Sequence, residues 1–348
     1  MNTNESAATR RERLAALLAR EIDPALAARA WELIAQARRI VLLAHEKPDP
    51  DALGSALGLA WALTPLGKQC VVACADPAPA NYTFLPGREE IVTELPDTDF
   101  DLVIALDAGE LSRYGALYWN HRAFFDSATL LNFDHHVTSQ GIGACAIIDV
   151  ASAATAELLT IFLLHRGVAI GPEAAICLLA GIITDTRAFE FDATTDRTLA
   201  AGAYLVASGA TPESIIKPMY RLKPLAKGRL WGRALQSLTS AAEGRIIWAS
   251  IRQRDFAATG ATPDMDDGLP AYLLDTEGVA LAALFRESAD GVTRVSLRGV
   301  APYDAAAICA QFGGGGHVRA AGCTLRMGID EAQRAFIPVL EAALRQQD

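Results

Sequence analysis

The sequence lacks any hydrophobic run long enough to cross a membrane. Its longest apolar stretches, such as Ala174–Ile183, are well short of the roughly 18 residues that a spanning helix needs. The N-terminal segment Met1–Arg20 is rich in charge and has no apolar core of the kind found in secretory signals. We therefore expect a cytoplasmic location and no membrane partner.

Cysteine and aromatic residues are also scarce. The six cysteines are scattered, mostly within apolar runs, and no two form a C-x-x-C pair. This argues against a zinc ribbon or a thioredoxin-like motif and favours buried thiols in a reducing compartment. Aromatic residues make up 7% of the chain, but hydrophobic residues of all kinds make up 51% of its 348 residues. That composition excludes disorder over most of the length, and the length favours two domains.

Positive charge is in short supply, but only in the first part of the chain. The sequence carries 31 Lys and Arg against 41 Asp and Glu, a net charge of −10. This argues against a partner such as long duplex nucleic acid. When the chain is divided after Leu205, the first part has a net charge of −11 and the rest has +1. The second part is therefore the better candidate for contacts with phosphate.

Apolar strands alternate with helical segments, which is typical of a mostly parallel α/β sheet covered on both faces. We predict strands over 40–44, 70–75, 102–106, 130–133 and 146–148. The helices between and after them are predicted over 14–38 (broken near Asp23), 52–66, 153–165 (capped by Ser152), 173–184 and 196–208. Residues 1–12 are expected to be frayed.

A second alternation follows a basic stretch and predicts a smaller α/β domain. Its helices are expected over 230–241, 304–312 and from about 330, and its strands over 246–251, 279–285, 292–297 and 323–325. We expect a first domain over 14–205, a basic linker over 206–228 and a second domain over 229–348.

Carboxylates and imidazoles follow the predicted strands of the first domain. His45, Asp49 and Asp51 come directly after strand 40–44, and Asp107 ends strand 102–106. Loops at the carboxyl ends of parallel strands build the sites of open α/β sheets. Oxygen ligands together with imidazole suit Mn²⁺ or Mg²⁺ better than a metal that prefers thiolates. Taken alone, each of these segments could also be a solvated turn or a helix cap.

Two further groups strengthen the metal interpretation. Asp134, His135 and His136 follow strand 130–133 without a break, and Asp185 ends an apolar helix. The dipole of a helix disfavours a carboxylate at its C-terminus, and a bound cation would compensate for that. The set is large enough for two divalent ions that clamp a phosphoryl group between them.

These motifs resemble those of the DHH phosphoesterase superfamily. The resemblance rests on the segment HEKPDPDALGS (45–55), on Asp107, on Asp134-His135-His136 and on Thr184-Asp185-Thr186. Near the C-terminus, FGGGGH (312–317) and AAG (320–322) look like the signature of a DHH-associated C-terminal domain. The two-domain layout, FLPG (84–87) and SLR (296–298) are similar to the nanoRNase/pAp-phosphatase type.

The resemblance implies a role for each site residue. One Mn²⁺ would be held by His45, Asp49 and Asp107, and a second by Asp51, Asp107, His135 and Asp185, so that Asp107 bridges the two; Mg²⁺ is the alternative metal. His136 would contact the phosphate or position the nucleophile, and Asp134 would orient a histidine. The residues expected to bind substrate are Arg298, Gly314, Gly315, Gly316 and His317, with Arg187 and Arg319 as further candidates.

The glycine run also has a physical interpretation of its own. Its backbone N–H groups can form a nest for an anion, and a histidine or arginine nearby can donate charge-assisted hydrogen bonds to phosphate. Two positions depart from the family pattern: Arg187 stands where glycine is frequent, and Gly299 where serine is usual. Neither is a predicted metal ligand, so both departures bear on the choice of substrate.

The expected enzyme has its active site in the cleft between the domains. It would hydrolyse short oligoribonucleotides and linear dinucleotides to 5′-mononucleotides and dephosphorylate pAp, by a two-metal hydroxide mechanism. The alternatives are a cyclic-di-AMP phosphodiesterase, a RecJ-like single-strand exonuclease and an inorganic pyrophosphatase. A nucleotide-binding sensor without catalysis would have lost a metal ligand, and none is missing. The resemblance alone also suggests a homodimer.

Overall fold

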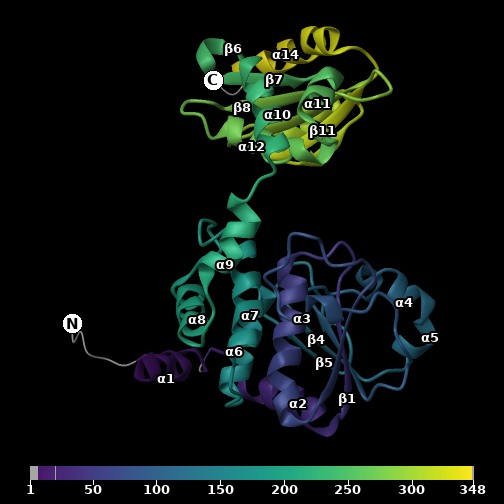
Figure 1. The fold of residues 1–348 in the computed structure, drawn as a ribbon, viewed down its shortest axis with the longest axis vertical. Helices are drawn as coiled ribbons and strands as arrows, with labels where there is room; N and C mark the ends of the chain where they lie inside the picture. Colours follow the sequence, from purple (N-terminus) through teal and green to yellow (C-terminus); the bar gives the residue numbers. More distant parts are fainter. Residues whose placement is uncertain (1–6, 20, 347–348) are drawn as a thin grey trace. The chain divides into compact units, whose positions relative to one another are not determined.

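The chain folds into two compact units, each built around its own sheet. The computed structural model describes residues 7–19 and 21–346, and the units meet in sequence between Leu222 and Lys223 (Figure 1). The predicted α/β class with a parallel sheet is confirmed. The exact domain boundaries and the placement of the active site in a cleft between the domains stay predictions.

The first sheet is entirely parallel and has the strand order β2-β1-β3-β4-β5. Its strands are β1 (Arg39–Ala44), β2 (Gln69–Cys74), β3 (Leu102–Leu106), β4 (Leu130–Asp134) and β5 (Cys145–Ile148). All five were predicted, with ends that differ by one residue at most. In the central pairing, residues 40–43 of β1 lie beside residues 102–105 of β3 in register. Because the strands are parallel, the segments that follow β1, β3 and β4 all leave the sheet at the same edge.

Helices cover both faces of this sheet, which explains why its strands are continuous apolar runs. Ile40 and Leu42 of β1 pack into a core formed with one group of helices, and Val41 and Leu43 pack into a second core on the opposite face. The first group consists of α2 (Pro24–Gln36), α3 (Pro50–Leu63), α6 (Thr155–His165), α7 (Pro172–Asp185) and α8 (Asp196–Ala207). The opposite face is covered by α4 (Ala116–Asn120) and α5 (Arg122–Phe125) (Figure 1).

Helices α3 and α7 pack unusually closely, because glycines lie at their contact. A Cβ atom on Gly54 would overlap the carbonyl oxygen of Cys177, and one on Gly181 would overlap a carboxylate oxygen of Asp51. The absence of both side chains brings the start of α3 and the end of α7 together. This contact places Asp51 and Asp185 at the same edge of the sheet.

The second unit contains a six-stranded mixed sheet with the order β10-β11-β9-β8-β7-β6. Its strands are β6 (Thr239–Ala241), β7 (Ile246–Ile251), β8 (Leu281–Glu287), β9 (Thr293–Gly299), β10 (Gly315–His317) and β11 (Ala320–Leu325). Only β7 and β8 pair in parallel. The glycine run is therefore not a flexible linker, because its second half forms an edge strand.

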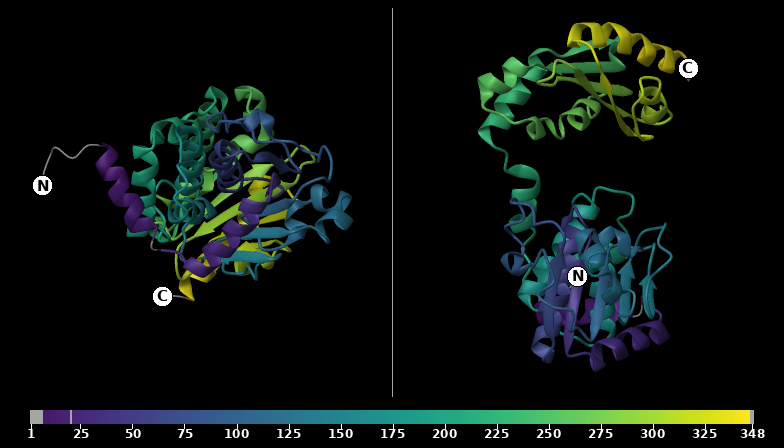
Figure 2. Two further views of the ribbon diagram at one scale, coloured as in Figure 1. Left: turned by 90° about the horizontal axis from the view of Figure 1, so that it is seen from below. Right: turned by 90° about the vertical axis from the view of Figure 1, so that its right-hand side faces the viewer.

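This second sheet is also covered on two sides. One core is shared with α10 (Leu225–Gln236), α11 (Gln253–Thr259) and α12 (Leu269–Leu274). The other is shared with α13 (Ala305–Ala310) and α14 (Ile329–Arg345), and α14 lies along the sheet in the right-hand view of Figure 2. None of the described helices is long and apolar enough to cross a membrane.

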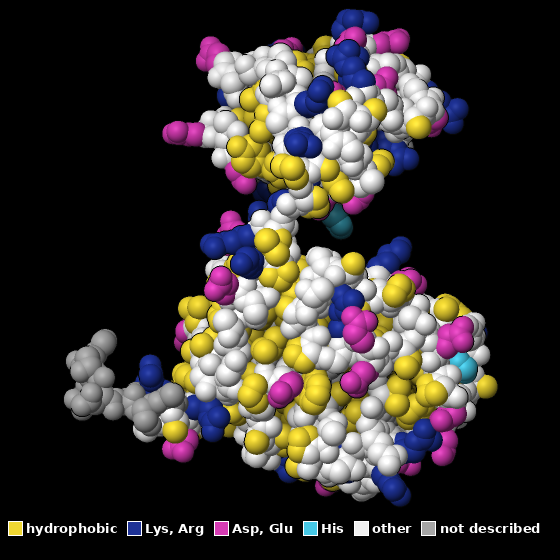
Figure 3. Space-filling model, in the orientation of Figure 1, with side chains coloured by type: hydrophobic (Ala, Val, Ile, Leu, Met, Phe, Trp, Pro, Cys, Tyr) yellow, Lys and Arg dark blue, Asp and Glu magenta, His cyan; other side chains and the backbone are white. Residues whose placement is uncertain are grey.

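Several predicted boundaries were wrong. Helix α1 (Ala7–Leu18) begins within the segment expected to be frayed, of which residues 1–6 lie outside the described residues. The segment 206–228, whose role as a linker stays a prediction, contains α9 (Pro212–Ile216), a π-helix over 217–221 and the start of α10. Basic side chains gather beside α9 in Figure 3. The predicted helix over 230–241 merged α10 with β6. Ser152 does not cap α6, whose N-cap is Ala154.

Candidate metal centre

The structure brings all the predicted metal ligands together in the first unit. They come from the loop after β1, the start of α3, the ends of β3 and β4, and the end of α7. Nearby side chains form three overlapping groups that could each hold a metal ion: His45, Asp49 and Asp107; Asp51, His135 and Asp185; Asp107, His135 and His136.

The first group surrounds the Nε2 atom of His45. This atom lies 3.5 Å from Oδ2 of Asp107 and 3.7 Å from Oδ2 of Asp49. The other ring nitrogen lies 2.8 Å from the carbonyl oxygen of Glu46, which fixes the orientation of the ring. Oδ1 of Asp49 accepts the N–H groups of Asp51 and Ala52 at the start of α3, so its other oxygen is the one that faces His45.

The second group surrounds the Nε2 atom of His135. It lies 3.4 Å from Asp185 Oδ2, 3.5 Å from Asp107 Oδ1 and 3.9 Å from Asp51 Oδ2. This atom is buried and has no hydrogen-bond partner among the described residues. A buried nitrogen that faces three carboxylates without a hydrogen bond is what a metal ligand looks like when no ion is present. The donor set therefore fits a divalent cation.

Asp107 links the groups around the two histidines, because each of its oxygens faces a different ring. Oδ2 faces His45 and Oδ1 faces His135, and Oδ1 also accepts a hydrogen bond of 2.9 Å from the hydroxyl of Thr155. Asp107 has a left-handed backbone with φ of 58°. Such a conformation costs on the order of 1 to 3 kcal/mol for a non-glycine residue, and it is found most often at functional sites.

Asp51 is fully buried at the start of another helix. Its two oxygens accept the N–H groups of Thr155 (2.7 Å) and Ala156 (3.0 Å), the first residues of α6. Asp51 therefore caps α6 from a distant segment. The positive end of that helix helps to hold a carboxylate away from water. Burial, together with Asp107 and Asp185, raises the pKa of Asp51 well above its usual range.

The like charges of the centre shift the pKa values of its members in the metal-free protein. Burial raises the pKa of Asp185 to about 6, opposed in part by His135, while Asp107 raises it further. Burial alone would lower the pKa values of the two histidines. Hydrogen bonds to Asp107 and Asp49 outweigh it at His45, with a pKa of about 10. At His135, the negative charges of Asp185 and Asp107 outweigh burial and give a pKa of about 9.

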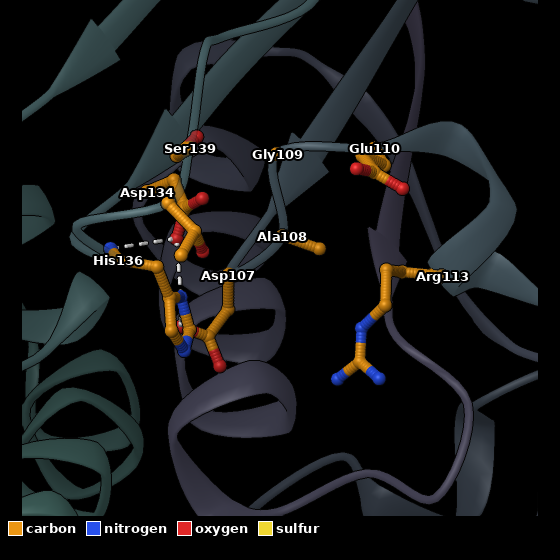
Figure 4. A pocket seen from close by; sticks show the side chains of 9 residues that line it. Asp107, Ala108, Gly109, Glu110, Arg113, Asp134, His136 and Ser139 are labelled. Carbon is orange, nitrogen blue, oxygen red and sulfur yellow. Dashed lines mark hydrogen bonds and ion pairs between the residues drawn. The ribbon is translucent and has the colours of Figure 1, made fainter.

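Asp134 and His136 form a hydrogen-bonded pair beside the centre. Oδ1 of the buried Asp134 accepts the ring Nδ1–H of His136 at 2.7 Å, and also the backbone N–H groups of His135 and His136. The half-exposed ring of His136 lines a cavity of about 280 Å³ (Figure 4). The bond at Nδ1 leaves Nε2 available to a ligand.

The predicted substrate residues of the second unit lie on or beside one face of its sheet. Arg298 is paired across β9 and β11 with Ala320, which is paired with His317 of β10, so the three side chains share a face. Gly314 cannot carry a side chain, because its Cβ would overlap the carbonyl of Gly322. It lines a neighbouring open cavity of about 370 Å³.

The remaining predicted substrate residues are less closely grouped. Gly315 and Gly316 lie in β10, and Arg319 is exposed just before β11. Arg187 is in the first unit, next to the end of α7, where it has a left-handed backbone (φ 49°) and an ion pair with Glu190. The structure therefore groups the metal ligands tightly, while it divides the substrate residues between the two units.

Sequence reasoning missed the residues that support the metal ligands. Thr155 donates to Asp107, and the carbonyl of Ser152 lies 3.2 Å from Nδ1 of His135. Arg197 holds the Ser152 hydroxyl and the fully buried Glu157. The hydroxyl-rich start of a predicted helix was the one available signal, and it was interpreted as an ordinary cap.

Comparisons with known proteins agree with this geometry. Residues 39–182 match the DHH family, N-terminal domain, and residues 247–346 match the DHHA1 domain. The bifunctional oligoribonuclease and PAP phosphatase NrnA of Thermus thermophilus is 35% identical over 87% of this chain and 88% of its own length. The cyclic-di-AMP phosphodiesterase PdeA of Listeria monocytogenes is 24% identical over 89% of this chain and 48% of its own length.

A solved structure shares the fold over most of the chain. The exopolyphosphatase-related protein of Bacteroides fragilis superposes with a TM-score of 0.76 at 22% identity, over 93% of this chain and 97% of that one. Together with the two domain matches and the 35% identical relative, this leads to one conclusion. The chain is a member of the DHH family, with a DHHA1 domain as its C-terminal part.

Proposed function

We propose that this protein hydrolyses short oligoribonucleotides and linear dinucleotides to 5′-mononucleotides, and that it also dephosphorylates pAp to AMP. The observation that carries the proposal is Asp107, whose two oxygens face two separate groups of ligands. A bridging carboxylate of this kind is typical of two-metal phosphoesterases. The 35% identical relative, which bears the oligoribonuclease and PAP phosphatase name, supports the choice of substrate.

The proposed cofactor is a pair of Mn²⁺ ions, with Mg²⁺ as the alternative. One ion would be held by His45, Asp49 and Asp107, and the other by Asp51, Asp107, His135 and Asp185. When bound, such ions activate water and neutralise charge on the phosphate oxygens. Oxygen and imidazole donors without thiolate favour these metals over softer ones.

The chain's own residues would orient the substrate. His136, with its Nδ1–H held by Asp134, presents Nε2 to the cavity and can donate a proton to a phosphate oxygen. In the second unit, Arg298 and His317 would donate hydrogen bonds to phosphate. The N–H groups of Gly313 and Gly314 already donate to the carbonyls of Ala310 and Cys309, so these two groups are not free to form the anion nest expected of the glycine run. Arg187 and Arg319 stay weaker candidates for the same task.

The cyclic-di-AMP alternative is not favoured. The relative with that activity in its name is more distant, and this chain spans about half of its length. The sequence-based expectations of a homodimer and a cytoplasmic location stay predictions.

A turnover panel tests the proposed function. The purified protein with Mn²⁺ is offered pApA, a short oligoribonucleotide, pAp and cyclic-di-AMP, and mononucleotide release is measured by chromatography. We expect the highest kcat/KM with the linear dinucleotide or the short oligoribonucleotide, measurable hydrolysis of pAp and little of cyclic-di-AMP. Faster turnover of cyclic-di-AMP than of pApA would contradict the proposal.

A further inference from the structure

The cavity beside Asp107 contains a cation to which the account so far assigns no role. Arg113 lines this cavity together with His136, Ser139 and Glu110 (Figure 4). Among the described residues, the Arg113 guanidinium has neither an ion pair nor a side-chain hydrogen bond, although Asp107, Glu110 and Asp134 line the same cavity. An arginine that lines a cavity without a protein partner is suited to bind an anion from solution.

Two hydrogen bonds fix the backbone at Arg113 and Tyr114, and they determine where the arginine side chain begins. The carbonyl oxygen of Arg113 accepts the N–H of Glu46 at 2.8 Å. The next residue, Tyr114, is fully buried, and its hydroxyl donates to the carbonyl oxygen of Leu106 at 3.0 Å. Both contacts tie the arginine to the segments that carry His45 and Asp107.

The nearby acid does not neutralise this arginine. Glu110 accepts a hydrogen bond from the hydroxyl of Ser112. In Figure 4 the guanidinium of Arg113 points away from Glu110, toward the side of the cavity where Asp107 and His136 lie. The cation therefore faces the same space as the proposed metal centre.

Two residues with hydroxyl groups and a glycine form another part of the cavity wall. Thr138 and Ser139 line the cavity, and a Cβ atom on Gly109 would overlap the Ser139 hydroxyl. The buried Asn132 fixes this wall, because its amide donates to the carbonyls of Ala105 and Ala108 and its oxygen accepts the N–H of Ile142. A cation, two hydroxyls and an imidazole around one space are the donors that a phosphate group needs.

We propose that Arg113, with Ser139 and Thr138, binds a second phosphate of the substrate, the 5′-phosphate of a linear dinucleotide. The inference rests on the proposed function, because the metal centre would hold the phosphate that is cleaved. It deepens that function by naming a preference: substrates with a 5′-phosphate bind this subsite, and substrates with a free 5′-hydroxyl leave it empty.

The experiment compares pApA with ApA, which lacks the 5′-phosphate, using the wild type, Arg113→Ala, Arg113→Lys and the control Arg122→Ala. Arg122 is an exposed arginine of the same unit that pairs with Asp126. The wild type should prefer pApA. Arg113→Ala should lose on the order of ten- to a hundredfold in kcat/KM for pApA, the effect of a lost charge-assisted hydrogen bond, and less than about threefold for ApA. Arg113→Lys should keep part of the preference, and Arg122→Ala all of it.

Two results would overturn the inference. Equal losses for pApA and ApA would mean that Arg113 acts on the cleaved phosphate or on the fold, and an unchanged preference in Arg113→Ala would mean that it contacts no phosphate. Circular dichroism and melting curves identify a variant that fails to fold, in which case Ser139→Ala provides the same comparison. A wild type that cleaves neither dinucleotide refutes the proposed function instead.

Discussion

Asp107 determines whether the site can hold one metal ion or two, because its two oxygens face different histidines. Its left-handed backbone turns the side chain back over the end of the sheet, and the hydroxyl of Thr155 holds one oxygen in place. The other ligands are each held through a second contact, as Asp49 is by the start of α3 and Asp51 by the start of α6. Hydrogen bonds within the protein therefore help to position these carboxylates.

Metal binding should release protons. Without metal, the carboxylates raise the pKa of His45 to about 10 and that of His135 to about 9, so both rings carry a proton at pH 7. Because a metal ligand must be a neutral imidazole, metal affinity should rise with pH between about 7 and 9. Calorimetry in buffers of different ionisation enthalpy measures the released protons.

The same shifts fix the sign of the pH dependence of stability in the metal-free protein. A raised histidine pKa stabilises the fold fully below the unfolded value of about 6.5, and this contribution is lost as the pH rises through about 9 to 10.

Two variants serve as tests of the proton release that accompanies metal binding. On binding metal, His45→Asn should release fewer protons than the wild type, while His121→Asn, outside the centre, should release as many. Heats that do not depend on the buffer would contradict the account.

Asp134→Asn should lower the pKa of His136. The carboxylate of Asp134 is the main reason why that pKa is raised, because it accepts the Nδ1–H of the ring. The titration of the His136 ring protons, followed by NMR in the metal-free protein, measures the change. Asp126→Asn, which removes an acid that pairs with Arg122 elsewhere in the unit, is the control and should leave the titration as it is.

At the scale of elements, glycines determine how closely the two helices that carry ligands approach. Gly181→Ala should destabilise the first unit by about 1 to 3 kcal/mol, because the new methyl group overlaps Asp51 in a packed interior. It should also weaken metal binding, since Asp51 must move. Chemical denaturation and metal titration measure the two effects.

Gly228→Ala is the matched control. Gly228 is exposed within α10, and nothing lies within 4 Å of the position that a Cβ would occupy. This change should stabilise α10 by roughly 0.5 to 1 kcal/mol, as expected for an exposed helical site, and leave metal binding unchanged. A Gly181→Ala variant as stable as the wild type would contradict the packing argument.

The strands of the first unit could be predicted because each is a continuous apolar run between turn residues. The short helices α4 and α5 could not, since four or five residues show no helical periodicity. β6 was missed for a similar reason: a three-residue edge strand follows α10 closely, and its Thr239 and Ala241 are compatible with either structure. Local sequence was therefore sufficient for long elements and insufficient for short ones.

At the scale of the whole molecule, the uneven distribution of charge matches the roles proposed for the two parts of the chain. The part before Leu205 has a net charge of −11 and holds the centre, where divalent ions would offset the carboxylates. The later part, with a net charge of +1, carries Arg298 and His317 on one open face. The negative total still disfavours long duplex partners, but it is compatible with a short nucleotide held through metal ions.

The metal ligands could be predicted from motifs, but the residues that hold those ligands in place could not. Contacts such as Thr155 with Asp107 and Arg197 with Glu157 join residues 48 and 40 positions apart. They exist only because the helices pack as they do. Arg113 went unnoticed for the same reason, since nothing in its local sequence shows that it lines the same cavity as His136.

The most direct test of the central claim is the number of metal ions bound, measured together with turnover, in the wild type and in Asp107→Asn. We predict two Mn²⁺ per chain in the wild type by metal analysis after equilibrium dialysis. The variant should bind fewer and should hydrolyse pApA about 10³-fold more slowly. The exposed control Asp99→Asn should match the wild type in both measurements. An Asp107→Asn variant that binds two ions and retains the turnover of the wild type would contradict the account.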